Sequence, residues 1–241
     1  MTAAWPRAIL LLLSLCTDFA AAEPWQALTS PDPAVRLWVM KSVTKEVATQ
    51  TPPHDPRPHD PSPYDIVRAE TEINAPILPL LALLQDAGRQ REWLPFTQDV
   101  RVVAQPAPHQ TLVQFRTVTR WPFRPRDAIT LFDVMQLSAA ELRIEMENQP
   151  DALPEEPGYL RIRQAEGHWL LSALDHCRTR VRYQSGSRWG GVIPQWLVNN
   201  SNRDLAVEAL LNLSQWAQHH HREYEGNNDL YPQITAHRHC R

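Results

Sequence analysis

The sequence contains few lysines, glycines and cysteines, and each shortage excludes a class of protein. Lys41 and Lys45 are its only lysines, and its 241 residues carry a formal net charge of -3. No basic field exists to attract nucleic acid, so we expect no nucleic-acid partner. The seven glycines and three cysteines make no phosphate-binding loop, no Cys-x-x-Cys pair and no Gly-x-Ser-x-Gly nucleophile elbow. We therefore expect no catalytic residue, no bound metal and no cofactor.

The sequence also lacks a hydrophobic run long enough to cross a membrane. The apolar run at residues 8–15 is too short to span about 30 Å of hydrocarbon. It follows Arg7 and precedes the small residues 20–22, a pattern typical of a secretory signal. We predict a signal peptide over residues 1–22 and a periplasmic or secreted mature protein. A lipoprotein alternative would use Cys16, but the residue before that cysteine is bulky where a small one is expected.

Proline, in contrast, is abundant, with 22 residues, many of them in one segment. Residues 51–64 form a proline-rich stretch that contains a small His-Asp-Pro repeat. Its histidines, His54 and His59, could ligate a metal. Proline holds the chain extended, however, and further ligands are missing, so we interpret the segment as a solvated loop.

Most of the remaining chain carries strand patterns, separated by turn residues at short intervals. These patterns predict strands over residues 34–40, 65–73, 100–103, 111–119, 128–135, 141–146, 159–163, 167–171 and 179–183. Residues 24–28 predict a single helical turn. A helix is expected to open at residues 74–76, with proline in its first turn, and to end at Gly88. Residues 89–93 predict a further short helical turn.

The last long segment predicts a helix that follows a tight glycine turn. Gly190 and Gly191 permit backbone shapes that other residues resist, and Pro194 suits the first turn of a helix. Apolar residues recur behind it at helical spacing: Leu205, Ala206, Ala209, Leu210, Leu213, Trp216 and Ala217. The element order predicts an α+β fold in which a curved antiparallel sheet wraps the final helix. On pattern alone, this helix could equally cap an ordinary core.

Three islands of sequence resemble START (StAR-related lipid-transfer) domains. They are Trp-Pro-Phe-Arg-Pro-Arg-Asp at 121–127, the segments 158–161 and 167–170, and the segments 179–183 and 190–199. The resemblance implies a helix-grip (START/Bet v 1-like) fold with an internal apolar cavity, closed by the C-terminal helix. It also implies a domain over residues 23–222, followed by a polar tail over residues 223–241. Many bacterial members carry Asp-Pro before the two glycines, whereas this sequence has Arg188 and Trp189.

The resemblance further implies a ligand site at the cavity and its lid. The candidate residues are Trp121, Phe123, Arg126, Trp169, Tyr183, Trp189, Ile193, Trp196, Leu197 and Asn200. Arg126 could meet a carboxylate or phosphate headgroup bidentately. The alternative for Arg126 is an ion pair with Asp127 or another acid.

These features predict a monomer that binds one hydrophobic molecule or lipid, such as a fatty acid, phospholipid, sterol or hopanoid, and that could also transport it. We also expect transient contact with a membrane surface. The first alternative is a polyketide cyclase or hydrolase-like enzyme on the same fold, although Asp175 and His176 lack a placed serine. The second is a periplasmic interaction protein whose cavity is filled by bulky side chains, which the nine tryptophans of the sequence favour.

Removal of the signal peptide would leave Cys177 and Cys240 as the cysteines of the mature chain. An oxidising compartment favours a disulfide between them. The alternatives are two free thiols, or a weak metal site formed by His237, His239 and Cys240. Residues 219–221 are three consecutive histidines near the end of the last helix. Consecutive helical side chains point in different directions, so a solvated helix end is favoured over a metal site.

Overall fold

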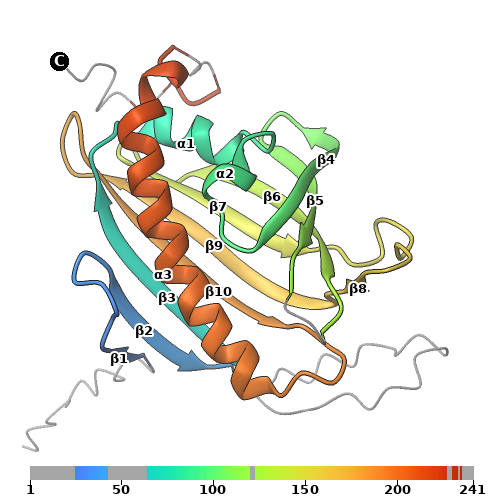
Figure 1. Ribbon diagram of the computed structural model, residues 1–241. Helices are drawn as coiled ribbons and strands as arrows, with labels where there is room; N and C mark the ends of the chain where they lie inside the picture. Colours follow the sequence, from blue (N-terminus) through green and yellow to red (C-terminus); the bar gives the residue numbers. More distant parts are fainter. Residues whose placement is uncertain (1–24, 43–63, 120–122, 227–229, 233, 235–241) are drawn as a thin grey trace, which may run out of the picture.

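The computed structural model describes residues 25–42, 64–119, 123–226, 230–232 and 234, and these form one curved sheet around a long helix (Figure 1). The strands are β1 (Gln26–Leu28), β2 (Arg36–Lys41), β3 (Asp65–Ile73), β4 (Thr97–Ala107), β5 (Gln110–Thr117), β6 (Arg126–Gln136), β7 (Glu141–Asn148), β8 (Leu160–Arg161), β9 (Gln164–Ala173) and β10 (Thr179–Arg188). The helices are α1 (Ile77–Gln85), α2 (Gln90–Trp93), α3 (Gln195–His220) and the 3-10 helix η1 (His221–Tyr224). The predicted signal peptide, most of the proline-rich loop, Trp121 and Cys240 lie outside the described residues.

The sheet runs in the order β1-β2-β3-β10-β9-β7-β6-β5-β4. Neighbours along this path are antiparallel, and the short β8 joins β6 in a parallel pair. Strands β4, β5, β6, β7, β9 and β10 therefore follow one another as a meander. The last of them, β10, pairs with β3 and so joins the meander to the N-terminal strands. Helices α1 and α2 lie between β3 and β4 in the sequence and cover one end of the sheet (Figure 1).

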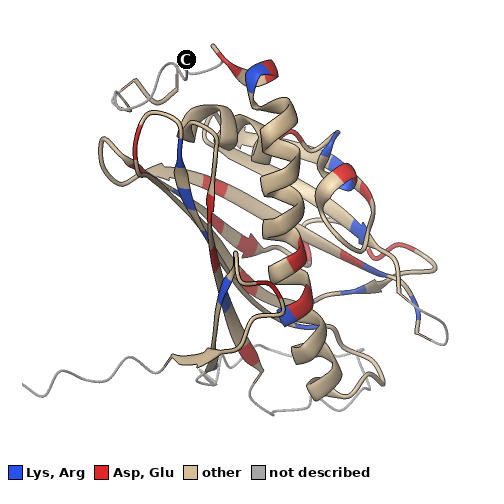
Figure 2. Cartoon of the chain, turned by 60° about the vertical axis from the view of Figure 1, so that its left-hand side comes forward, with Lys and Arg blue, Asp and Glu red and all other residues tan. Residues whose placement is uncertain are grey.

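Paired charges cover part of the outer surface of β2, β3 and β10. Glu70, which is buried, forms ion pairs with Arg36 and Arg182 on the neighbouring strands. Arg180 pairs with Glu72 at 3.0 Å in the same way. Residues of both signs therefore lie next to each other across these strands, as Figure 2 shows. Cross-strand pairs of this kind help to fix the register of a sheet.

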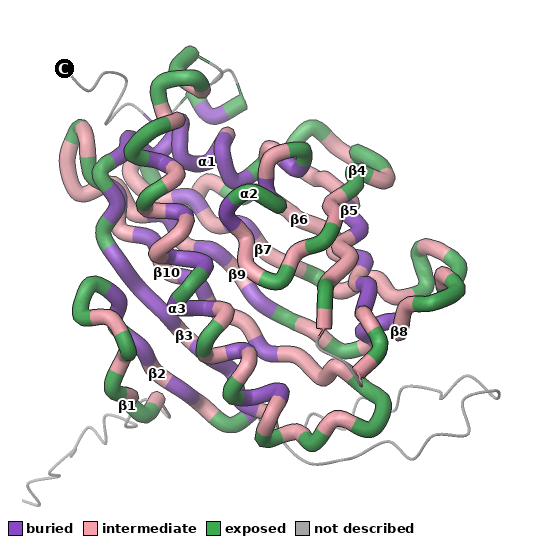
Figure 3. The backbone as a smooth tube through the Cα atoms, viewed as in Figure 1, coloured by how far each residue is buried: buried purple, intermediate pink, exposed green. Residues whose placement is uncertain are grey.

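Helix α3 packs its apolar side against the concave face of the sheet, over β3 and β10. Ala206, Leu210, Leu213 and Ala217 are fully buried there, as their spacing predicted. Burial is concentrated in the central part of the strands beneath α1 and α3 (Figure 3). Among the described residues, none of the helices is both long and apolar enough to span a membrane.

The turn before α3 has the predicted geometry. Gly190 and Gly191 have φ values of 67° and 75°, in the left-handed region that favours glycine. Pro194 occupies the N-cap position of the helix, one residue earlier than the first turn. The glycine turn thus reverses the chain between the end of β10 and the start of α3.

Most predicted strands are confirmed, and several extend further than their patterns indicated. The expected helical turn at residues 24–28 is wrong, because β1 occupies this segment and pairs with β2. An isolated helical turn is not stable by itself, whereas the edge of the sheet offers backbone partners. Helix α1 ends at Gln85 rather than Gly88, and Pro76 is its N-cap. The strand expected over residues 159–163 is reduced to the two residues of β8.

Described parts of the C-terminal tail dock on the domain through apolar and aromatic residues. Tyr231 and Ile234 are buried in the main hydrophobic core. The Tyr224 hydroxyl donates a 2.8 Å hydrogen bond to Asp86 at the end of α1. The segment after α3 therefore contributes to the fold, although its composition is polar.

Candidate ligand-binding cavity

A cavity of about 230 Å³ lies among the concave face of the sheet, the α1–α2 segment and α3. Its size is near the lower end of the ~300–1,000 Å³ range of ligand pockets, which suits one ligand. Alternate residues of each strand face into it, as the pleat requires. On β5 and β6 these residues are Thr111, Val113, Phe115, Thr117, Thr130, Phe132 and Val134.

Aromatic rings form much of the interior. Trp169 and Tyr183 lie on neighbouring strands with ring centroids 4.3 Å apart, and Trp93 meets Trp169 edge-on at 6.4 Å. Phe115 and Phe132 form a second pair across β5 and β6 at 5.8 Å. These rings offer a large apolar surface in fixed geometry, which suits an apolar ligand.

The lining reaches the surface near the ends of β4 and β5. Phe96 and Val118 both line the cavity, yet they are 45% and 50% exposed. The two residues are joined by a 2.9 Å hydrogen bond from the Val118 amide to the Phe96 carbonyl. Phe96 has a φ of 58°, an unusual and strained value for a bulky residue. We take this pair to mark the opening of the cavity.

The structure brings together only some of the predicted site residues. Trp169, Tyr183 and Trp189 line the cavity. The other described candidates, Phe123, Arg126, Ile193, Trp196, Leu197 and Asn200, are not part of the lining.

Trp196 is 64% exposed, so its ring does not face the cavity interior as expected. The physical reason is that Trp196 lies on the outward side of the first turn of α3, whereas Val198 and Asn199 on its inward side are buried. Cavity-lining residues of α3 begin only at Asn202 and Leu205.

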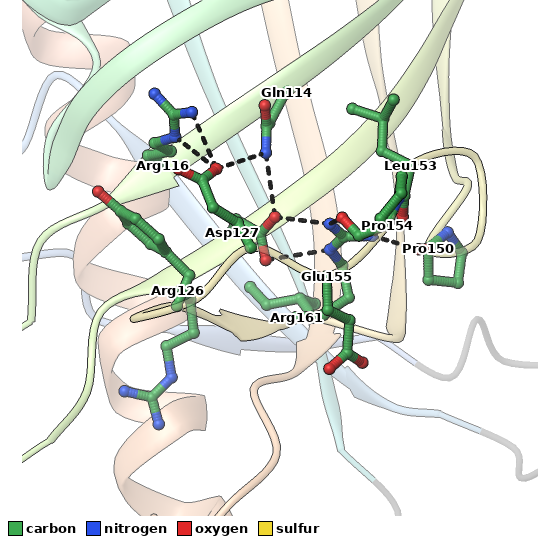
Figure 4. A network of polar contacts seen from close by, with 12 residues as sticks. Gln114, Arg116, Arg126, Asp127, Pro150, Leu153, Pro154, Glu155 and Arg161 are labelled. Atoms are coloured by element: carbon green, nitrogen blue, oxygen red, sulfur yellow. Dashed lines mark hydrogen bonds and ion pairs between the residues drawn. The ribbon is translucent and has the colours of Figure 1, made fainter.

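A buried ion pair lies at the start of β6, on the face of the strand that points away from the cavity. Arg161 on β8 donates to both carboxylate oxygens of Asp127, over 3.0 and 2.8 Å, and both side chains are 1% exposed. Gln114 donates a further 3.1 Å bond to Asp127 (Figure 4). The remaining Arg161 donors bond the carbonyls of Pro150, Leu153 and Pro154. This network holds the loop between β7 and β9 against β6.

The alternative in which Arg126 pairs with Asp127 is therefore wrong. The two residues are neighbours on a strand, so their side chains point to opposite faces (Figure 4). Arg126 is 2% exposed, and its guanidinium carbon lies 5.8 Å from the centre of the Trp189 ring. Its hydrogen bonds run to backbone carbonyls of Arg124 and Gly190. Arg126 thus connects the end of the 123–126 segment to the glycine turn before α3.

The remaining polar features have structural roles in this arrangement. Asp175 accepts hydrogen bonds from the Cys177 amide and the Arg178 side chain, and these interactions lower the pKa of its carboxyl. It therefore shapes the turn between β9 and β10. His219 and His221 bond backbone carbonyls of α3 one turn earlier. Across the described ranges, no three His, Cys, Asp or Glu side chains are grouped to hold a metal ion.

Several cavity residues were not singled out from the sequence. Gln90, Trp93, Phe115, Phe132, Asn148 and Asn202 all line the cavity. Strand alternation shows which residues of β5, β6 and β7 share a face. It does not show which face becomes concave, because that depends on how the sheet bends around α3.

No family model matches the chain. An uncharacterized protein of Pseudomonas aeruginosa is 25% identical over 151 residues, which cover 63% of this chain and 74% of that protein. This similarity extends over most of the relative, but its description assigns no activity.

Solved structures with the same fold are more informative. A STAR-related lipid transfer protein from Xanthomonas axonopodis matches with a TM-score of 0.66 and 21% identity, covering 81% of this chain and 99% of that one. Human STARD10 matches with a TM-score of 0.65 and 18% identity, over 90% of this chain and 84% of its own. Human StAR-related lipid transfer protein 5 matches with a TM-score of 0.66 and 14% identity, over 84% of this chain and 90% of its own. The chain therefore has the helix-grip fold of the START domains.

Proposed function

We propose that the protein binds a single hydrophobic ligand, a lipid, in the cavity and transfers it between sites. The observation that carries this proposal is the cavity itself, with the rings of Trp93, Trp169 and Tyr183 inside and an opening beside Phe96. The proteins of like fold that are named as lipid transfer proteins support it.

The energetics of apolar burial are sufficient for such binding. A chain of about fourteen methylenes gains about 11 kcal/mol at about 0.8 kcal/mol for each group buried. Association costs act in the opposite direction and amount to about 4–15 kcal/mol, so the net gain depends on how low this cost is. Binding in the micromolar to nanomolar range is therefore reachable once a polar group of the ligand also finds a partner.

A cavity-filling variant tests the proposal. Ala165 lines the cavity, so Ala165→Phe places a ring in the space that the ligand would occupy. We expect this variant to keep its fold by circular dichroism and to lose most of its affinity for a fluorescent fatty acid ester. Ala139→Phe adds the same ring at an exposed turn and serves as the control. Equal binding by both variants would mean that the ligand does not enter this cavity.

We further propose that the protein contacts a membrane transiently when it exchanges ligand. Val192 and Trp196 follow the cavity-lining Trp189, and they are 91% and 64% exposed. Exposed tryptophan and aliphatic residues close in sequence to a residue of the cavity lining suit the interfacial region of a bilayer.

Export from the cytoplasm and a Cys177–Cys240 disulfide remain proposals of this account. Residues 1–22 have the composition of a secretory signal, and an oxidising compartment favours pairing of the two mature cysteines. Sequencing of the mature N-terminus should begin at Glu23, and a non-reducing peptide map should join the two cysteine peptides. A mature protein that retains Met1 would exclude the export proposal, and ready alkylation of both untreated thiols would exclude the disulfide.

A further inference from the structure

Arg126 belongs to the inward face of β6. Thr130, Phe132 and Val134 line the cavity from this strand, and Arg126 continues the same alternation toward its start. Its pairing partner on β5 is Thr117, which also lines the cavity. The guanidinium lies near Trp189, another lining residue. Arg126 is not itself among the lining residues, but it lies next to the lining residues Thr117 and Trp189, at the glycine turn before α3.

The hydrogen bonds of Arg126 contrast with those of Arg161, which lies nearby and is equally buried. Every nitrogen of the Arg161 guanidinium has an acceptor, and two of its bonds reach a carboxylate. Arg126 bonds two backbone carbonyls, one of them at 3.5 Å, and its buried Nε has no acceptor. Among the described residues, no carboxylate forms an ion pair with Arg126.

This arrangement leaves a positive charge uncompensated inside the protein. Burial, and next the neighbouring Arg124 cation, hold the pKa of Arg126 below its ordinary value. Burial of a cation without a counter-charge is unfavourable, and an anionic partner reduces this penalty. An anion that reaches Arg126 from the cavity would recover this energy, because a guanidinium can bind a carboxylate or phosphate through two parallel bonds.

A second polar group accompanies Arg126 at this end of the cavity. The Trp189 indole donates to Ser187 over 3.0 Å, and Ser187 donates to Asn202 Oδ1 over 3.2 Å. Asn202 lines the cavity, is 4% exposed, and its buried Nδ2 has no acceptor. A second unpaired N–H group thus belongs to the chain of hydrogen bonds that starts at Trp189, whose ring lies 5.8 Å from the Arg126 guanidinium carbon. The other unpaired atoms of the lining belong to Gln90, Trp93 and Asn148, which are neutral.

We infer that the ligand is an acidic amphiphile whose carboxylate or phosphate headgroup binds Arg126 beside Asn202. Its apolar chain then extends along the cavity toward Trp169 and Tyr183. This inference rests on the proposed function and specifies the ligand class for the same cavity. It excludes neutral ligands such as sterols and esters as the preferred occupants.

The test compares cis-parinaric acid, a fluorescent fatty acid, with its methyl ester on the full mature chain. The wild-type protein should bind the acid at least about tenfold more tightly than the ester, as expected for a hydrogen bond to a charged group. Arg126→Gln should lower the affinity for the acid to that of the ester and leave ester binding unchanged. Dodecyl phosphate and dodecanol, used as competitors, repeat the comparison for a phosphate headgroup.

Arg222→Gln is the control, because it removes an equal charge from an exposed residue of η1, which follows the far end of α3. It should leave the ratio of acid to ester affinity unchanged. Should Arg126→Gln not fold, Arg126→Lys retains the charge without the planar fork and should reduce the ratio. The ratio of acid to ester affinity in the wild-type protein tests the inference even if neither variant folds.

Equal wild-type affinity for the acid and the ester would overturn the inference and leave the proposed function standing. Failure of both probes to bind would instead contradict the proposed function. Inorganic phosphate provides the last arm. If phosphate stabilised the wild type but not Arg126→Gln, while acid and ester bound equally, the site would serve a free anion and the inference would be wrong.

Discussion

Arg161 and Asp127 form a bidentate ion pair across the parallel β6–β8 contact, with both side chains 1% exposed. The same arginine bonds carbonyls of Pro150, Leu153 and Pro154 in the preceding loop. One side chain thus joins a short strand, a proline-containing loop and the start of β6. Arg126, the residue before Asp127, points to the opposite face of β6, where its guanidinium lies next to the cavity-lining Trp189.

Removal of this pair should destabilise the protein strongly. Asp127→Asn leaves Arg161 buried without its counter-charge, and the expected loss is about 3–5 kcal/mol in the free energy of unfolding. Urea denaturation measures it. Asp151→Asn is the control, because Asp151 pairs with Arg163 at the surface and its loss should cost less than about 1 kcal/mol. Similar losses in the two variants would contradict the structural role given to Asp127.

Gly167 should not tolerate a side chain. A Cβ atom at this position would overlap the Gln184 carbonyl on β10 and the Met146 methyl on β7. Gly167→Ala should therefore disturb the β9–β10 pairing and cost about 1–3 kcal/mol or more, which thermal unfolding would detect. Gly88→Ala has room for its Cβ and should change stability little. A Gly167→Ala protein as stable as the wild type would mean that β9 and β10 lie further apart.

His168 should make the protein less stable in mild acid. Burial, and then the Arg143 cation, lower the pKa of His168 to about 4, whereas Glu145 acts in the opposite direction. The unfolded chain takes up the proton near pH 6.5, so it binds more protons than the folded state between these values. Stability is therefore complete above about pH 6.5 and falls as the pH is lowered toward about 4.

The ring of His168 is only partly buried, and solvent screening should limit this loss to about 1–2 kcal/mol. Chemical denaturation at several pH values measures it. His168→Gln should remove this part of the pH dependence, and His109→Gln, at an exposed site, should not. An unchanged pH profile in His168→Gln would show that other groups cause the acid sensitivity.

Trp196 should matter for transfer more than for ligand binding. Trp196→Asp places a charge on the exposed start of α3, where the ring is outside the cavity. We expect ligand affinity to stay within about twofold and the rate of ligand transfer to lipid vesicles to fall several-fold. Leu137→Asp adds a charge at another exposed apolar residue and should leave transfer unaltered. Equal slowing by both variants would argue against a specific membrane contact at Trp196.

Much of the fold could be predicted because its signals are local. The strand at residues 65–73, the glycine turn at Gly190 and the apolar spacing of Leu210 and Leu213 all appear in the structure as expected. Strand alternation and helical spacing depend on near neighbours in the sequence. The short β1 strand was missed because its only support comes from β2, which is a tertiary contact.

The candidate site was harder to predict. Trp196 was expected to face the ligand, but its exposure depends on which side of α3 packs against the sheet, where Val198 is buried instead. The partner of Asp127 is Arg161, which lies 34 residues away in sequence and reaches it only through the β6–β8 contact. Because Asp127 pairs with Arg161, it does not provide a counter-charge for Arg126. Spacing along the sequence contains no signal for such a relationship.

Native mass spectrometry of the protein purified from its own host tests directly whether this cavity holds a lipid. We expect one bound molecule of lipid mass for each chain, released on unfolding and identified as an acidic amphiphile. The Ala165→Phe variant from the same host should be largely empty. A wild-type protein that carries no ligand, and takes up none from vesicles or a lipid extract of that host, would contradict the claim that this cavity holds a lipid.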